Sequence, residues 1–421
     1  MSRPVQCIHR DTAVPACRSV QVVLIQRLRL ARDGAIAILL IAIGLATPSA
    51  SSVADTPAPR KQVWAAPDSG SDGHEQLRAV AAALAKGSVV RIQLESSASH
   101  LTRARMLRDG RAQYAATSVA GSVFAQEGLF AFAGHEWGPQ PVRAVLMNVQ
   151  NQLLGIVAAG DAGITTLAEL KGKRIARIKD APEIDQHLRA LLAHAGLTWK
   201  DVTSVRTEGY AAALREVASG RADVAFAASR TPELQGLASS KRGLVWPLVP
   251  HADATGWTLL RQWAPYMVPV DATEGVGLSE KLPVESVSWP YPVVVTLARR
   301  NPDDVQAVTG ELIARWRDFR GAAPGNAGWE AKRQPLAWAI PWHEGAIRVF
   351  RAQGLWRDEH QLHQDRLVER QRVLRQAWDA LFKPAQPDTD RDPPDEAAWL
   401  KGRAAALQKA GLDTLWNAAA D

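Results

Sequence analysis

The chain has 421 residues, which exceeds one typical domain and suggests two, with a core large enough to fold without disulfides. Its apolar content of 47% and charged content of 22% are those of a globular protein and exclude a disordered or fibrous chain. The formal net charge is +7, but residues 1–54 carry six arginines and two aspartates, so subtracting their +4 leaves about +3. This small, evenly distributed charge does not indicate a nucleic-acid partner, and we predict none.

An uncharged apolar run, residues 35–46, follows several arginines and precedes a stretch of small residues. This order is typical of a signal peptide, and the run is short for a membrane span. We therefore predict that residues 1–54 are a leader with a cleavable signal peptide and that the protein is periplasmic; an uncleaved membrane anchor is the alternative. Because Cys7 and Cys17 both lie in this leader, the exported chain would have no disulfide and no thiolate metal site.

Strand and helix patterns alternate along the first part of the predicted exported chain. Strands are expected at residues 62–66 and 89–94, helices at 77–85 and 101–107, and a third strand after a turn at Gly110. Two further strands are expected at residues 142–147 and 153–158. This is the βαβαβ order of an α/β fold.

Residues 161–178 indicate the start of a second α/β half, because they combine a turn, a short capped helix and a buried strand. Thr165 or Thr166 can cap the helix, and Glu169 completes a capping box with Thr166. Gly172 can supply the left-handed residue that ends the helix. Alternating helices and strands follow at residues 183–195, 202–207, 211–219 and 223–228. Two such halves predict a ligand cleft at the carboxyl ends of strands.

Twelve of the fifteen tryptophans lie at or after Trp246, and residues 246–291 are rich in proline. A strand is expected at residues 293–297, returning to the first lobe, and helices at 302–319, 344–353, 358–382 and 397–415. We therefore divide the chain into lobe 1 (residues 61–155 plus 287–382), lobe 2 (residues 156–286), and a linker with a C-terminal helical extension (residues 383–421).

Three segments resemble the TAXI family, the solute-binding subunits of tripartite ATP-independent periplasmic (TRAP) transporters. Residues 341–348 read P-W-H-E-G-A-I-R, where that family has a proline, an apolar residue, a histidine and G-A-I-R. Residues 165–176 and 194–197 add to the resemblance. It implies an α/β, two-lobed periplasmic binding protein, type II-like, with a hinge between the lobes. It also implies capture of a small organic solute, commonly a carboxylate, and delivery to the membrane permease subunit of a TRAP transporter.

The three ligand loops depart from the family pattern. Residues 67–74 replace a Gly-Thr-rich turn, Ser118 and the two residues after it replace Gln-Ser-Asp, and residues 179–184 replace a Gly-Ser-Gly-Thr turn. An unmodified family ligand is therefore not expected. The alternatives are a sensor or interaction module of the same fold with a diverged pocket, and the binding protein of an ATP-driven importer.

Candidate ligand-binding residues lie after or before predicted strands and at the starts of predicted helices. The small-residue loop before the first helix can offer amide N–H groups to a carboxylate, although Ser71 or Asp72 as a plain N-cap is an equal alternative. Arg230 can grip an acid group with its planar fork, or lie on the surface. The candidates are Ser69, Gly70, Ser71, Asp72, His74, Thr117, Ser118, Asp180, Glu183, Arg230, Trp289 and Tyr291.

Several of these candidates also have ordinary structural interpretations. The hydroxyl groups of Thr117 and Ser118 can donate to a ligand or simply satisfy a strand end. Asp180 and Glu183 are more often partners of the helix dipole; if they face the cleft, they favour an amine on the ligand. Trp289 and the neighbouring tyrosine can line an apolar wall, although core packing is the more common role of aromatic residues.

Motifs of enzymes are missing from the sequence, including the nucleophile elbow, the P-loop and the dinucleotide fingerprint. His360 and His363 lie one helical turn apart, but no third metal ligand has clear spacing, so a solvated charged helix is the better interpretation. His343 is interpreted as part of a packed turn. We predict no enzyme, no catalytic or metal-binding residue and no cofactor.

Overall fold

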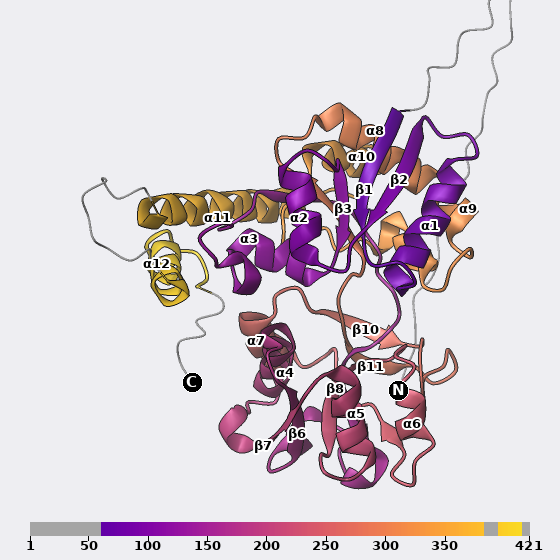
Figure 1. Cartoon of the computed structure of the whole chain (residues 1–421), viewed down its shortest axis with the longest axis vertical. Coiled ribbons are helices and arrows are strands. Elements are labelled where there is room, and N and C mark those ends of the chain that lie inside the picture. The colour runs from indigo at the N-terminus through magenta and orange to yellow at the C-terminus, as the bar shows by residue number, and fades with distance from the viewer. Residues whose placement is uncertain (1–59, 383–394, 415–421) are drawn as a thin grey trace, which may run out of the picture. The chain divides into compact units, whose positions relative to one another are not determined.

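The computed structural model describes residues 60–382 and 395–414, which form two α/β lobes and a helical C-terminal region (Figure 1). Each lobe contains one five-stranded sheet, named here the first and the second sheet. The predicted leader and most of the predicted linker lie outside the described residues. Within the described part, no helix combines the length and apolarity that a bilayer span requires.

The first sheet mixes parallel and antiparallel strands. Across the sheet its strands are β2 (Val90–Ser96), β1 (Arg60–Ala66), β3 (Tyr114–Thr117), β12 (Val293–Leu297) and β4 (Val142–Met147). The first three are parallel because α1 (Asp72–Leu84) and α2 (His100–Arg108) are the crossovers between them. The strand predicted at residues 293–297 is confirmed; it enters this sheet antiparallel to both of its neighbours.

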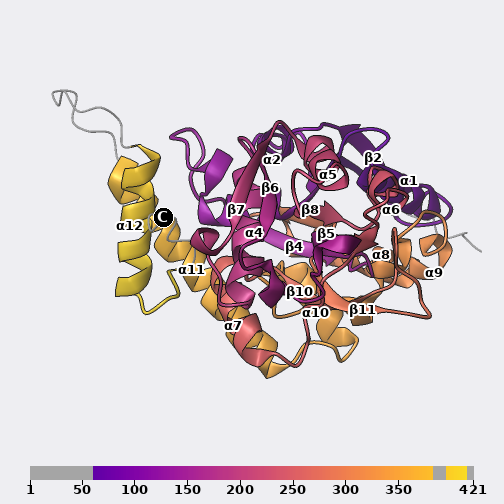
Figure 2. The ribbon, with the colours of Figure 1, turned by 90° about the horizontal axis from the view of Figure 1, so that it is seen from below.

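The second sheet carries helices on both faces (Figure 2). Its strands, in order, are β7 (Thr203–Thr207), β6 (Arg174–Ile178), β8 (Val224–Ala228), β5 (Leu154–Ala159) and β9 (Leu244–Val245). Phe226 packs in the same cluster as Leu188 of α4 (Pro182–His194), whereas Ala225 packs with Leu214 of α5 (Tyr210–Ala218). Successive residues of β8 thus face opposite helices, as expected for a doubly covered sheet.

The capping box predicted before β6 is confirmed. Thr166 and Glu169 make its two reciprocal hydrogen bonds around a short 3-10 helix, Leu167–Leu170. Gly172 follows with φ +75°, the left-handed conformation that ends the turn before the strand begins.

Two adjacent segments carry the chain between the lobes. Residues 148–153 lead from β4 to β5, and residues 289–292 lead back to β12. They are hydrogen-bonded to each other, because the Tyr291 N–H donates to the Asn148 carbonyl at 2.8 Å and Asn148 N–H donates to the Pro292 carbonyl at 3.0 Å. These crossover segments are therefore a paired connection rather than two separate loops.

Residues 231–291 hold elements that the sequence analysis did not predict. They are α6 (Leu234–Ala238), α7 (Ala254–Trp263) and the antiparallel hairpin of β10 (Val268–Ala272) and β11 (Val284–Ser288). The prediction of one helix over residues 302–319 is wrong. Arg315, with φ −99° and ψ 9°, separates α8 (Pro302–Ala314) from α9 (Trp316–Phe319), because its backbone leaves the helical region.

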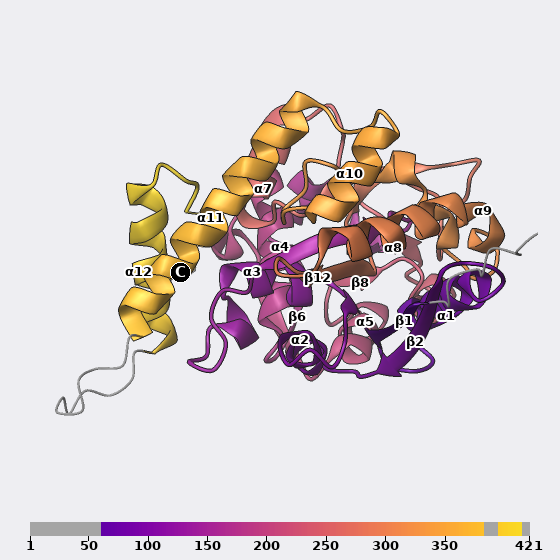
Figure 3. The same ribbon diagram turned by 90° about the horizontal axis from the view of Figure 1, so that it is seen from above.

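The C-terminal region consists of helices packed on the first lobe and on each other. Figure 3 shows α8 beside α10 (Glu344–Ala352), with α11 (Asp358–Phe382) next along the chain. The bounds of α11 are those predicted. The last helix, α12 (Glu396–Lys409), packs on α11, where the rings of Trp378 and Trp399 meet edge to face with centroids 4.8 Å apart.

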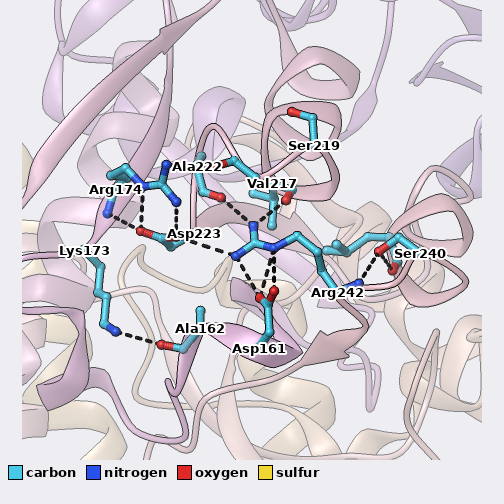
Figure 4. Close-up of polar contacts among 12 residues, drawn as sticks. Asp161, Ala162, Lys173, Arg174, Val217, Ser219, Ala222, Asp223, Ser240 and Arg242 are labelled. Atoms are coloured by element: carbon cyan, nitrogen blue, oxygen red, sulfur yellow. Dashed lines mark hydrogen bonds and ion pairs between the residues drawn. The ribbon is translucent and has the colours of Figure 1, made fainter.

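A charged network joins four strands at one edge of the second sheet (Figure 4). Asp223, just before β8, accepts hydrogen bonds from Arg174 of β6 at 2.6 and 3.0 Å. Arg242, just before β9, lies 3.7 Å from the same carboxylate and 2.7 Å from Asp161, which follows β5. Arg242 also donates to the carbonyl of Val217 at 2.7 Å. The network therefore links four strands at the end of the sheet where β8 begins, opposite the carboxyl end of β8.

Asp223→Asn is expected to lower the free energy of unfolding by about 1–2 kcal/mol. The substitution removes the negative charge that Arg174 binds, and the effect is small because this ion pair is partly exposed. Hydrogen bonding from Arg174 holds the pKa of Asp223 below its usual range. This stabilisation is fully present above the unfolded pKa of about 3.9 and is lost as the pH falls through the folded value. Urea denaturation checks this, with the exposed Asp318→Asn as a control expected to change little. Equal effects of the two substitutions would contradict it.

Candidate functional site

Arg230 connects the two lobes through an ion pair. It follows β8 of the second sheet, and its guanidinium lies 3.1 Å from the carboxylate of Asp72, the first residue of α1 in the other lobe. It also donates to the side-chain oxygen of Gln150 at 2.9 Å, and Glu274 lies 3.9 Å away. The Arg230 side chain is 17% exposed, so its charge is largely removed from water. Its partners come from lobe 1, from lobe 2 and from one of the two crossover segments.

Two cavities border this arginine. A cavity of about 350 Å³ is lined by Asp72, Arg230 and the crossover residues Gln150, Gln152, Trp289 and Tyr291, among others. A second cavity of about 570 Å³ is lined by Arg230, Glu274 and the loop at Gly325. We name the first the crossover cavity. Both volumes lie in the range of small-molecule sites in proteins.

The crossover cavity has an aromatic wall with neutral groups behind it. Trp289 packs against His187 of α4 with ring centroids 4.4 Å apart, and against Phe226 in a stacked arrangement at 6.0 Å. Burial lowers the pKa of His187 to about 3, so this imidazole is uncharged at neutral pH. Burial also raises the pKa of Tyr291, an effect that Arg103 opposes and Asp72 reinforces, so the phenol keeps its proton.

The loop before α1 has mostly structural contacts. Ser71 is the N-cap, and its hydroxyl accepts a hydrogen bond from the His74 N–H at 3.3 Å. The hydroxyl of Ser96, at the end of β2, contacts Ser69 at 3.3 Å and the His74 ring at 3.1 Å. Gly70 is exposed, with φ +85°. Of this loop, only Asp72 lines either cavity beside Arg230.

The other polar candidates lie away from both cavities. Ser118 accepts a hydrogen bond from the Ala120 N–H at 3.2 Å, which supports the turn after β3. Thr117 is 1% exposed, and its hydroxyl has no hydrogen-bond partner in the described part of the chain. Asp180 is exposed with φ +55°, and Glu183 lies in the first turn of α4. The structure thus brings together Asp72, Arg230, Trp289 and Tyr291 and not the remaining candidates.

One family model matches the chain. Residues 93–251 match the model described as NMT1/THI5 like. The matched segment includes every strand of the second sheet, together with Gln150 and Arg230. This segment is therefore similar to NMT1/THI5-like proteins, a coarser assignment than the TAXI resemblance, which stays a prediction.

Solved structures of a periplasmic binding protein and of a substrate binding domain are also similar to the chain. One is the periplasmic aliphatic sulphonate binding protein SsuA from Escherichia coli, with 16% identity and a TM-score of 0.40, covering 71% of this chain and 80% of that one. Another is substrate binding domain 2 of GlnP from Lactococcus lactis in its open conformation, with 12% identity and a TM-score of 0.37, covering 65% of this chain and 97% of that one. No curated protein sequence matches the chain significantly.

The sequence analysis missed the polar residues that the crossovers and one loop contribute. Gln150 and Gln152 lie in the segment between two buried strands, and Glu274 follows β10. A signal was present, because three consecutive polar residues, 150–152, interrupt an otherwise apolar region. Polar residues between two strands of different sheets mark a segment that passes near both lobes. Among the described residues, no group of three or more His, Cys, Asp or Glu side chains could hold a metal ion.

Gly325→Ala is expected to displace the Arg230 side chain and to weaken the binding of a ligand to it, because Gly325 lies against Gln150 and Arg230. An added Cβ would stand 2.2 Å from the Gln150 side-chain oxygen and 2.8 Å from the Arg230 guanidinium, and the backbone has φ +81°. The strain should also lower the free energy of unfolding by about 1–2 kcal/mol. Gly411→Ala is a control, since Gly411 has φ +66° and open space around it. Calorimetry measures the affinity of both variants for a ligand of the Arg230 site. If Gly325→Ala bound this ligand as tightly as the unmodified chain does, the prediction would be contradicted.

Proposed function

We propose that this protein is a solute-binding receptor whose crossover cavity takes a small zwitterionic carboxylate, with the acid group on Arg230 and the amine toward Asp72. The observation that carries the proposal is a pair of opposite charges 3.1 Å apart, contributed by different lobes and lining one cavity. A solute with both charges can replace this internal ion pair without leaving a charge unpaired. A simple carboxylate would have to compete with Asp72 for the arginine.

The aromatic wall supports a solute with an apolar or cationic portion. Trp289 and Tyr291 line the same cavity as the ion pair, and Gln150 and Gln152 supply amide groups there. A solute amine can lie over an aromatic face as well as near a carboxylate. Charge-assisted hydrogen bonds contribute about 1.5–3 kcal/mol each, so a few of them with the apolar wall suffice for the roughly 8 kcal/mol of a micromolar complex.

Lobe closure follows from the same arrangement. We infer that residues 61–155 with 287–382 and residues 156–286 move as two lobes about the crossover segments. A solute that touches both Arg230 and Asp72 makes its full set of contacts only when these residues are near each other, so binding favours the closed population.

A calorimetric titration with amino acids, simple carboxylates and sulfonates, guided by thermal shift, tests the proposed solute class. For a zwitterionic solute, Asp72→Asn should weaken binding, because the amine loses its counter-charge. For a simple anion, the same substitution should tighten binding, because Arg230 is released; that result would overturn the zwitterion. Glu75→Gln, on the same helix and paired with Arg78, is the matched control. No binding to the whole panel would favour the sensor or interaction module.

Delivery to a transporter is part of the proposal. We propose a periplasmic receptor, exported by the predicted signal peptide, that serves a TRAP-type permease; the binding protein of an ATP-driven importer is the alternative. Uptake of the identified solute into vesicles containing the cognate membrane subunits distinguishes them. Uptake that needs an ion gradient and no ATP supports the TRAP assignment, whereas uptake that needs ATP overturns it.

A further inference from the structure

A third cavity lies away from Arg230, where the C-terminal helices meet the rest of the molecule. Its volume is about 530 Å³, within the range of small-molecule sites. Its walls come from α3 (Ala125–Glu127), the segment from α7 to β10, residues 337–339, α11, and the residues that follow α12. We name it the C-terminal cavity. It shares no lining residue with the two cavities that border Arg230.

The inner end of this cavity holds a buried charge cluster with an excess of positive charge. Glu127 is 1% exposed and accepts two hydrogen bonds from Arg370 of α11, both at 2.8 Å. Arg403 of α12 reaches the same carboxylate at 2.5 Å. Burial alone would raise the pKa of Glu127, but the two guanidinium groups lower it to about 2. One carboxylate therefore faces two permanent cations, and the inner end of the cavity is electropositive.

The rim of the cavity adds two further arginines. Arg261 of α7 and Arg366 of α11 both line it, both are exposed, and neither forms an ion pair with any described residue. Asp413 is the only other carboxylate among the lining residues besides Glu127. The lining groups thus include two cations without a carboxylate partner among the described residues, against the single carboxylate of Asp413. The Arg261 guanidinium also lies over the Trp257 ring, 5.3 Å from the ring centroid.

The body of the cavity is apolar. Met267 and Trp338 are buried, at 1% and 2% exposure, and line it together with Leu367 and Leu412. The Trp338 ring N–H is already hydrogen-bonded to the Tyr266 carbonyl at 2.9 Å, so the indole adds no donor to the cavity. A ligand that fills this space therefore needs an aliphatic or aromatic body.

We propose that the C-terminal cavity binds an amphipathic organic anion. Its acid group lies between Arg261 and Arg366 at the rim, and its apolar body lies on the partly exposed side chains of Leu367 and Leu412. Guanidinium groups suit carboxylate and sulfonate oxygens because their N–H groups form a planar fork. Leu412 comes from the segment after α12, so the C-terminal extension supplies part of the binding wall. The C-terminal extension, which does not line the crossover cavity, would thus have a role in binding a second ligand.

Fluorescence titration with anilinonaphthalene sulfonate tests the site on the full chain. We expect one high-affinity site per chain, weakened about tenfold by Arg366→Gln or Arg261→Gln and nearly abolished by both together. Arg206→Gln is the matched control, because Arg206 is exposed in β7 and lines none of the three cavities. N-phenylnaphthylamine, which has the same body without the sulfonate, should bind at least about tenfold more weakly to the unmodified chain.

The outcomes separate this site from the crossover cavity. Arg230→Gln should leave the probe affinity unchanged, and the double variant Arg261→Gln/Arg366→Gln should still bind the solute of the crossover cavity. Equal probe affinity in the double variant and the unmodified chain would overturn the proposal. Equal affinity for the charged and uncharged probes would overturn it as well, because the site would then not select an anion.

Discussion

Glu127→Ala is expected to lower the free energy of unfolding by about 3–5 kcal/mol, because it leaves the guanidinium groups of Arg370 and Arg403 buried without their counter-charge. Arg370 is 7% exposed and Arg403 is 1% exposed, so neither guanidinium can be fully hydrated once the carboxylate is lost. The same three residues join α3, α11 and α12, so the attachment of the C-terminal helix should weaken first. Urea denaturation followed by tryptophan fluorescence and circular dichroism measures the effect.

The pH dependence gives this prediction a second readout. The folded pKa of Glu127 is about 2, below the value near 4.3 of an unfolded glutamate. The stabilisation is therefore complete above about pH 4.3 and is lost as the pH falls toward 2. The stability difference between the unmodified chain and Glu127→Gln should stay constant from about pH 7 to pH 5 and narrow below about pH 4.3.

Glu369→Ala is the matched control for this prediction. Glu369 is an acidic residue of the same helix, α11, but it is 45% exposed and pairs with Arg372 on the surface. Surface ion pairs contribute about 0–1 kcal/mol, so this variant should unfold almost as the unmodified chain does. Equal loss of stability in the Glu127 and Glu369 variants would contradict the prediction, because the buried cluster would then contribute no more to the free energy of unfolding than a surface ion pair does.

Arg230→Gln is expected to weaken binding of the proposed solute by about 1.5–3 kcal/mol, which is roughly 10- to 150-fold in affinity. Glutamine keeps one donor near Gln150, but it cannot pair with an acid group or with Asp72. Asp72 and Glu274 would then repel the acid group, which adds to the loss. Isothermal calorimetry with the identified solute gives the affinity.

Arg215→Gln is the control for this variant, since Arg215 lies exposed on α5 and lines neither of the cavities beside Arg230. Its affinity should equal that of the unmodified chain. Arg230→Gln should also keep most of its thermal stability in the absence of solute, because Asp72 is 62% exposed and can be hydrated. A loss of solute affinity that only follows a loss of folding would count against a binding role.

The fold class was predictable from the sequence, because its signals are local and strong. The two α/β lobes with a helical C-terminal region are confirmed, and the bounds of β4, β12 and α11 agree with the prediction. These elements have continuous apolar runs or long helical periodicity. The region around β10 and β11 was not predicted, because proline interrupts the alternation of β10 and the strands are held by pairing with each other.

The candidate site was predictable only in part. Arg230 was named because it follows a predicted strand, Asp72 because it lies where a loop enters a predicted helix, and Trp289 and Tyr291 because they precede the returning strand. The structure gathers these four residues around one cavity. The sequence does not reveal that Arg230 already holds Asp72, since residues so far apart in the chain meet only through the relative position of two sheets. For the same reason, it does not reveal that the segment after α12 lines the C-terminal cavity.

Native mass spectrometry of the full chain, equilibrated with a broad metabolite extract, tests the central claim most directly. The account predicts one small, zwitterionic carboxylate bound per chain, released with its mass unchanged, and lost in Arg230→Gln but not in Arg215→Gln. A chain that binds no metabolite would contradict it. Release of a chemically altered molecule, or equal occupancy in the Arg230→Gln variant, would contradict it as well.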